Sequence, residues 1–303
     1  MSLTQPRLAD SFAGARRSPQ QKITAHTLQQ KKQARQPITA LTAVDYPTGR
    51  LVDEAGVDLV LVGDSLAMTV LGYDSTLPLT MDEMLHHVKA VRRGVKHALL
   101  VADMPFGSYH VSTEKALRNA LRFVQEGGAE AVKLEGGRHR AALVEQLTLA
   151  EIPVVGHIGL TPQSLHRMGG YKVQGRSVPA IETLLADAAA LEGAGAIALV
   201  VEGVPREVAA RITRSLSIPV IGIGAGPECD GQILVFHDLC TLTFANPAKF
   251  VRRFADAGQL LREGLAAFCA VVEERSFPND AESYHLPADV AAALEGELAG
   301  GRR

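Results

Sequence analysis

The sequence lacks the features of disulfide-rich, membrane-spanning and nucleic-acid-binding proteins. Its 303 residues include only three cysteines, which stand far apart, without a CxxC pair or a neighbouring histidine cluster. This excludes a disulfide framework and a zinc ribbon, and it favours a reducing cytoplasm. Apolar runs such as residues 59–62 have the length of a strand, whereas a membrane-spanning helix needs about 20 apolar residues. The formal net charge of −2 gives no reason to expect a nucleic acid or an anionic membrane as partner.

The two ends of the chain differ from the rest. Residues 1–36 contain seven Lys or Arg against a single acid, Asp10. We expect a disordered basic extension at residues 1–20, followed by a short helix near residues 23–33. An organelle transit peptide is also basic and poor in acids, but the Gln-rich composition disfavours it. At the other end, we expect a helix and tail at residues 288–303.

Between these ends, one pattern repeats eight times. An apolar run rich in Val, Ile, Leu and Ala ends in polar residues or glycine, and an amphipathic stretch follows most of the runs. Near-continuous apolarity over five or six residues is typical of parallel strands that are covered on both faces. The predicted strands are residues 37–43, 58–64, 98–105, 131–136, 153–160, 196–203, 219–226 and 232–238.

The segments between the runs carry helix signals. One opens with Thr80-Met-Asp-Glu, as in a capping box, and others place a proline early. Eight strands leave a closed barrel or a doubly wound open sheet. The count of eight and the polar strand ends favour one (β/α)8 TIM barrel over residues 21–287, an α/β fold with an N-terminal extension and C-terminal helices. The predicted helices include residues 80–96, 112–126, 179–192 and 205–215.

Ionisable side chains stand at the carboxyl ends of five successive predicted strands, where barrel enzymes carry their active sites. Lys133 and Glu135 are two positions apart on one strand, so both point to the same face, and the barrel interior is the face that suits them. Four carboxylates at one mouth would repel one another unless a divalent cation bound there. A hard ion such as Mg²⁺ suits all-oxygen ligands. The candidate residues are Asp64 with Ser65, Asp103, Lys133 with Glu135, His157 and Glu202.

Each candidate also has an ordinary structural interpretation. Taken singly, they could be a helix cap, a turn residue, a structural ion pair, a hydrogen-bonded core histidine and a loop cap. Their recurrence at five successive strand ends favours a functional cluster. Two loops add to it. Residues 161–177 are long, polar and Gly-rich, as in a lid or substrate clamp. Residues 221–226 fit either a phosphate cradle or a close approach of backbone to a ligand.

Six longer motifs run in order through residues 20–285, and together they resemble the ketopantoate hydroxymethyltransferase family. The likeness has no large gaps, and it implies a phosphoenolpyruvate-mutase-like barrel. The motifs are Val62-Gly-Asp-Ser-Leu, Asp74-Ser-Thr-Leu-Pro, Val132-Lys-Leu-Glu-Gly-Gly, Gly156-His-Ile-Gly-Leu-Thr-Pro-Gln-Ser, Gly170-Tyr-Lys-Val-Gln-Gly and Ile221-Gly-Ile-Gly-Ala-Gly.

The resemblance implies a reaction and roles for the candidate residues. A hydroxymethyl group would pass from 5,10-methylenetetrahydrofolate to 3-methyl-2-oxobutanoate through a Mg²⁺-stabilised enolate, giving 2-dehydropantoate on the route to pantothenate. The partners would be these two small molecules and further copies of the chain in a homodecamer. The implied roles are Mg²⁺ ligands for Asp64, Asp103 and Glu135, oxo-acid contacts for Asp64, Ser65, Asp103 and Lys133, the general base for Glu202 and an auxiliary position for His157.

Three alternatives remain. A C–C lyase or decarboxylase of the same superfamily would also chelate an oxo acid through Mg²⁺, but such enzymes typically carry a catalytic cysteine in a mobile loop, and no cysteine precedes Cys229. A phosphate-binding synthase would rest on the glycines of residues 224–226 alone. A non-catalytic barrel would have lost its strand-end residues, and all of them are present here.

Overall fold

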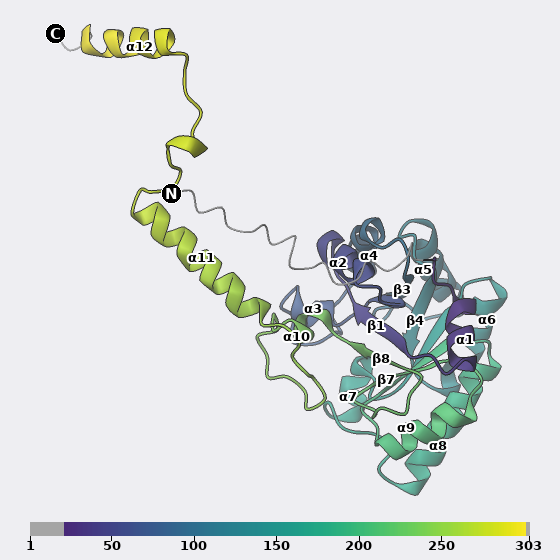
Figure 1. Ribbon diagram of the computed structural model, residues 1–303. Coiled ribbons are helices and arrows are strands. Elements are labelled where there is room, and N and C mark those ends of the chain that lie inside the picture. The colour runs from purple at the N-terminus through teal and green to yellow at the C-terminus, as the bar shows by residue number, and fades with distance from the viewer. Residues whose placement is uncertain (1–20, 301–303) are drawn as a thin grey trace. The chain divides into compact units, whose positions relative to one another are not determined.

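The chain forms a closed barrel of eight parallel strands in sequence order, with helices around the outside (Figure 1). A computed structural model describes residues 21–300, with side chains up to residue 294. The predicted (β/α)8 barrel is therefore confirmed, and the predicted basic extension at residues 1–20 lies outside the described residues. The strands are β1 (Ile38–Thr42), β2 (Leu59–Val62), β3 (Leu99–Asp103), β4 (Ala131–Glu135), β5 (Val154–Gly159), β6 (Ala198–Glu202), β7 (Val220–Ile223) and β8 (Gly231–Leu234).

Helices follow most of the strands. The capping box predicted at Thr80 is present, since its side chain accepts from the backbone of Glu83 while the Glu83 carboxylate accepts from Thr80. No helix of the described residues is both long and apolar enough to cross a membrane. The α-helices are α1 (Ala25–Gln33), α2 (Tyr46–Glu54), α3 (Leu66–Thr69), α4 (Met81–Gly94), α5 (Thr113–Gln125), α6 (Ala141–Leu149), α7 (Leu165–Met168), α8 (Val178–Gly193), α9 (Arg206–Ser215), α10 (Phe236–Leu239), α11 (Ala257–Glu273) and α12 (Ala288–Gly300).

From the eighth strand onward, the structure differs from the prediction in two respects. The eighth strand was predicted to reach residue 238, but β8 ends at Leu234 and α10 follows. The apolar residues after Leu234 are typical of either element, and periodicity does not separate a short strand from a short helix. C-terminal helices were predicted, but no residue range was predicted for the 17-residue helix α11.

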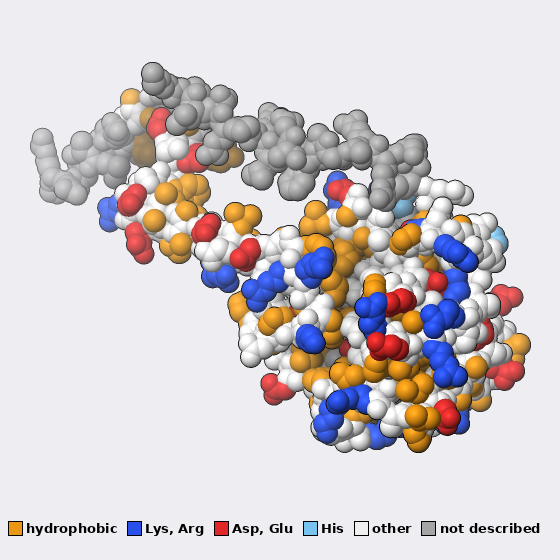
Figure 2. Space-filling model, turned by 60° about the horizontal axis from the view of Figure 1, so that its bottom comes forward, with side chains coloured by type: hydrophobic (Ala, Val, Ile, Leu, Met, Phe, Trp, Pro, Cys, Tyr) orange, Lys and Arg blue, Asp and Glu red, His pale blue; other side chains and the backbone are white. Residues whose placement is uncertain are grey.

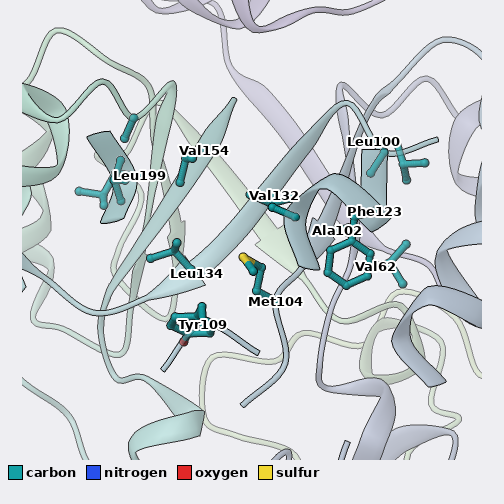
Figure 3. Close-up of a cluster of buried hydrophobic side chains, with 14 of the residues drawn as sticks. Val62, Leu100, Ala102, Met104, Tyr109, Phe123, Val132, Leu134, Val154 and Leu199 are labelled. Carbon is teal, nitrogen blue, oxygen red and sulfur yellow. The ribbon is translucent and has the colours of Figure 1, made fainter. Parts of the chain in front are cut away.

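Alternation along the strands divides the apolar side chains into two layers. One layer fills the barrel interior, and the other packs between the strands and the helices. Figure 3 shows part of the outer layer, where Phe123 of α5 lies with Val62 and Ala102 of β2 and β3. Because the strand period is two, a candidate polar residue that stands two positions after an interior apolar residue points into the barrel as well. The steps are Val101 to Asp103, Ala131 to Lys133 and Glu135, Val155 to His157, and Val200 to Glu202.

Helix α1 closes the amino end of the barrel. Its Leu28 is fully buried in the interior layer, which contributes about 1.5–3 kcal/mol to stability. Three lysines in or near α1 each pair with an acid that directly precedes a strand, so charge fixes the helix over three separate strands. The pairs are Lys22–Glu130 at 2.6 Å, Lys31–Asp58 at 2.6 Å and Lys32–Asp230 at 2.7 Å.

The residues separate into two compact units. The barrel unit ends at Phe254, and the second unit begins at Ala255 and contains α11 and α12. The boundary between barrel and tail at residue 287 stays a prediction. Helix α12 begins at Ala288, where the C-terminal helix was expected.

Candidate active site

All seven candidate residues line one cavity of ≈ 180 Å³ at the carboxyl end of the barrel. They come from five neighbouring strands, β2 to β6, and the cavity is closed on another side by Phe250. Phe250 also accounts for one glycine of the 221–226 loop, because a Cβ on Gly224 would lie 2.5 Å from its ring. The residues are Asp64, Ser65, Asp103, Lys133, Glu135, His157 and Glu202.

Lys133 and Asp103 form a buried ion pair on adjacent strands, with Nζ 2.9 Å from Oδ2. Burial opposes the charge on Lys133, but the carboxylates of Asp103, Asp64 and Glu135 outweigh it and raise the pKa of Lys133 above its usual range. Burial and the charges of Asp64 and Glu135 raise the pKa of Asp103, and the ammonium group of Lys133 opposes this shift. Lys133 is therefore a fixed positive charge in the cavity, and its partner is Asp103 rather than Glu135.

His157 lies between two carboxylates. Its Nδ1 is 3.4 Å from Oε1 of Glu135, and its Nε2 is 3.2 Å from Oε2 of Glu202. Burial and the charge of Lys133 lower the pKa of His157, yet Glu135 and Glu202 raise it further, to about 9. A protonated imidazole in this position attracts both carboxylates by charge, although neither contact is a hydrogen bond.

Glu202 differs from the other carboxylates in its access to the cavity. Its side chain is 15% exposed, whereas those of Asp103 and Glu135 are 1% and 2% exposed. An open carboxylate that lines the same cavity as a fixed ammonium group suits proton abstraction from an anionic molecule.

Two residues that the sequence did not single out connect the carboxylates. Gln163 donates from Nε2 to Asp64 Oδ2 (2.9 Å) and from its backbone N–H to Glu135 Oε2 (3.0 Å). Tyr109, which lies with Met104 and Leu134 in Figure 3, donates to Gln163 Oε1 at 2.6 Å. Gln163 stands inside a motif of the resemblance, but neither residue follows a strand period that would have predicted its contacts.

A family model for ketopantoate hydroxymethyltransferase matches residues 22–280. The chain belongs to this family. It is 64% identical over 274 residues to the 3-methyl-2-oxobutanoate hydroxymethyltransferase of Koribacter versatilis, covering 90% of this chain and 93% of the relative. Against the enzyme of the same name from Thermoanaerobacter sp., it is 51% identical over 88% of this chain and 97% of the relative. The predicted hydroxymethyltransferase class is thereby confirmed.

Solved structures of low sequence identity share the barrel of this ketopantoate hydroxymethyltransferase family member. A phosphonopyruvate hydrolase solved with oxalate and Mg²⁺ aligns with a TM-score of 0.57 at 13% identity, over 92% of this chain and 97% of that one. A 2,3-dimethylmalate lyase of the PEP mutase/isocitrate lyase superfamily aligns with a TM-score of 0.55 at 15% identity, over 91% and 98%. These likenesses bear on the fold alone, and the fold is the predicted one.

The donors in the cavity fit a hard cation in an open site. Asp103 Oδ1 and Glu135 Oε1 are buried without a hydrogen-bond partner, which is costly unless something else satisfies them. Within the described residues, no group of three His, Cys, Asp or Glu side chains is arranged to hold a metal ion by itself. Mg²⁺ can bind in such an open site, because it completes its shell with water and substrate oxygens.

Proposed function

We propose that this chain transfers a hydroxymethyl group from 5,10-methylenetetrahydrofolate to 3-methyl-2-oxobutanoate, giving 2-dehydropantoate for pantothenate biosynthesis. Membership of the family and the names of the relatives support the substrate and the reaction. The observation that carries the proposal is the cavity itself, in which the buried ammonium of Lys133 and the open carboxylate of Glu202 line the same space.

Three carboxylates are assigned to the metal. Asp64, Asp103 and Glu135 would hold Mg²⁺, and the two unpartnered oxygens of Asp103 and Glu135 support this assignment. Bound Mg²⁺ would supply Lewis-acid polarisation of the keto and carboxylate oxygens of the oxo acid. Lys133, with Ser65 at the same cavity wall, would bind and orient the anionic end of the substrate.

Glu202 is assigned the proton transfer. Its carboxylate would accept the C3 proton of the oxo acid, and the resulting enolate carbon would form a bond to the one-carbon unit of the folate. Water would supply the hydroxyl oxygen, both bonds from the one-carbon unit to the folate nitrogens would break, and the two nitrogens would take up the C3 proton and one proton of the water, which releases tetrahydrofolate. His157, 3.2 Å from Glu202, would fix the position of this carboxylate rather than touch the substrate.

The decisive assay is formation of 2-dehydropantoate from the two substrates, with and without EDTA. We expect product with Mg²⁺ and its loss with EDTA, reversed by excess Mg²⁺. Absence of product in the presence of metal would refute the function. Product that persists in EDTA would refute the metal assignment alone.

Self-association is the second part of the proposal. Helix α11 exposes a row of apolar side chains, each 44–66% exposed. Figure 2 shows hydrophobic side chains at the surface of the segment that carries this helix. Such a row is typical of a surface that is covered by another protein chain. The row consists of Leu261, Leu265, Phe268 and Val272.

A homodecamer and a cytoplasmic location stay predictions.

A further inference from the structure

A second cavity of ≈ 260 Å³ adjoins the candidate active site. Glu135 lines both cavities, and Gln163, which donates to Glu135, lines the second one. The walls of this second cavity come from the segments that follow β3, β4 and β5. A ligand in it would therefore extend directly from the reacting centre.

Two arginines give the second cavity its charge. Arg140 and Arg167 line it, and in the described part of the chain no carboxylate lies within ion-pair distance of either guanidinium. The neighbouring Arg138 differs, since its Nε lies 3.5 Å from Asp187. Arg140 is also held in place, with its guanidinium carbon 4.9 Å from the centre of the Tyr109 ring. Its Nε is buried and has no hydrogen-bond partner. A buried charged donor without a protein partner is costly unless a water molecule, an ion or a ligand atom satisfies it.

The positive charge of the arginines also affects the pKa values of two histidines beside them. Burial, Arg140 and His139 lower the pKa of His110 to about 4. Burial, Arg140 and Arg167 also lower the pKa of His139. Both imidazoles are neutral near pH 7, so the cavity has two guanidinium charges without acidic partners, and it favours an anion.

Aromatic rings stand next to these charges. Phe106 is 44% exposed, and its ring centre lies 4.8 Å from that of His110, which in turn lies 4.2 Å from that of Tyr109. Flat aromatic surfaces bind an aryl group by stacking. The cavity thus combines a wall for an arene with two cations for carboxylates. The oxo acid has no arene, and Lys133 already serves its carboxylate.

We infer that this basic cavity binds the aminobenzoyl-glutamate end of the folate donor, with Arg140 and Arg167 receiving its glutamyl carboxylates. The inference rests on the proposed function and assigns a subsite to its second substrate. A further cavity of ≈ 450 Å³ shares Gly136, His139 and Arg167 with this one and is also lined by Arg138. Asp187 lines this cavity as well and pairs with Arg138, so the cavity offers room for additional glutamates, with Arg167 as its unpaired positive charge among the described residues.

The test compares two ligands, tetrahydrofolate and the primary amide of tetrahydropteroate, which lacks the glutamate and carries no carboxylate. Dissociation constants of both ligands are measured by calorimetry for the wild type, Arg140→Gln, Arg167→Gln and the control Arg93→Gln. Arg93 is an exposed arginine in the last turn of α4. We expect the wild type and the control to bind tetrahydrofolate at least about tenfold more tightly, because the amide has no carboxylates to accept charge-assisted hydrogen bonds from the arginines. In each of the two test variants the ratio should fall to within about threefold.

Several outcomes would overturn the inference. One is a wild type that does not distinguish the two ligands. Another is an unchanged ratio in both variants, or an equal weakening of both ligands. A third is a loss of affinity for 3-methyl-2-oxobutanoate instead, which would give the arginines to the oxo acid. Because Arg167 is exposed, its variant remains informative even if Arg140→Gln does not fold. The proposed function fails on a different result, the absence of 2-dehydropantoate from the wild type.

Discussion

The hydroxyl of Tyr109 donates a hydrogen bond to Oε1 of Gln163 at 2.6 Å, and both side chains are buried. The same hydroxyl accepts the backbone N–H of Glu135 at 3.2 Å. Because Oε1 is engaged, the Gln163 amide turns its Nε2 toward Asp64. One phenol outside the cavity centre therefore orients groups on two of the proposed metal ligands, as outer-shell partners do in metal sites.

The change Tyr109→Phe should weaken both the fold and metal binding. It leaves Gln163 Oε1 and the N–H of Glu135 buried without their partner, which costs about 1–3 kcal/mol. Loss of an outer-shell partner typically lowers metal affinity by about 10- to 100-fold. Urea unfolding measures the first effect, and Mg²⁺ titration of the folded variant measures the second. Tyr284→Phe removes an exposed hydroxyl and is the matched control. Wild-type values for both quantities in Tyr109→Phe would contradict this role.

The change Glu202→Gln should abolish deuterium exchange at C3 of the oxo acid while Mg²⁺ binding persists. Glutamine keeps the size of the side chain but cannot accept the proton, and loss of a general base costs about 10²–10⁴ in rate. Exchange is followed by NMR in deuterium oxide without folate, so the measurement isolates the proton transfer. Glu207→Gln, at an exposed position of α9, is the control. Undiminished exchange in Glu202→Gln would remove this residue from the reaction.

The sequence predicted that the strand-end residues converge, because both the strands and the way a barrel arranges them can be inferred from it. Parallel strands read as short apolar runs, and the barrel brings their carboxyl ends together, so the convergence of Lys133, His157 and Glu202 followed from counting strands. The contacts made by Tyr109 and Gln163 could not follow in the same way, because both lie outside the strands and no period fixes where a loop side chain points. Helix α11 did leave a signal, an apolar residue at each of positions 261, 265, 268 and 272, and the prediction overlooked it.

At the opposite end of the barrel, the change Asp53→Asn should lower stability in a pH-dependent way. The Asp53 carboxylate on α2 accepts the backbone N–H groups of Lys96, His97 and Ala98 just before β3, at 2.8–3.0 Å. Burial raises the pKa of Asp53, but these N–H groups and the His97 side chain, whose Nδ1 lies 2.9 Å from Oδ2, lower it more, so the net pKa lies below its usual value. Hydrogen bonds to a charged group contribute about 1.5–3 kcal/mol, and we expect a loss in that range at pH 7.

The sign of the pH dependence follows from the lowered pKa. The contribution of the ionised Asp53 is complete above the unfolded pKa of about 3.9, and it is lost as the pH falls through the lower folded value. The difference in unfolding free energy between wild type and Asp53→Asn should therefore be constant from about pH 7 to 5 and shrink below about pH 4. Asp82→Asn, which breaks an exposed pair with Arg122, should cost less than about 1 kcal/mol. A difference that grows on acidification would contradict the account.

The exposed row on α11 gives the last prediction, the effect of Leu265→Glu on self-association. Residues 261, 265, 268 and 272 follow the i, i+4, i+7, i+11 spacing of one helical face. Burying such a leucine against another chain contributes about 1.5–3 kcal/mol, whereas a buried glutamate without a partner opposes association. We expect light scattering to find a smaller assembly for Leu265→Glu and the wild-type assembly for Gln259→Glu, a change to the same residue on a polar position of α11. An unchanged mass in Leu265→Glu, with circular dichroism like that of the wild type, would mean that this face is not the interface.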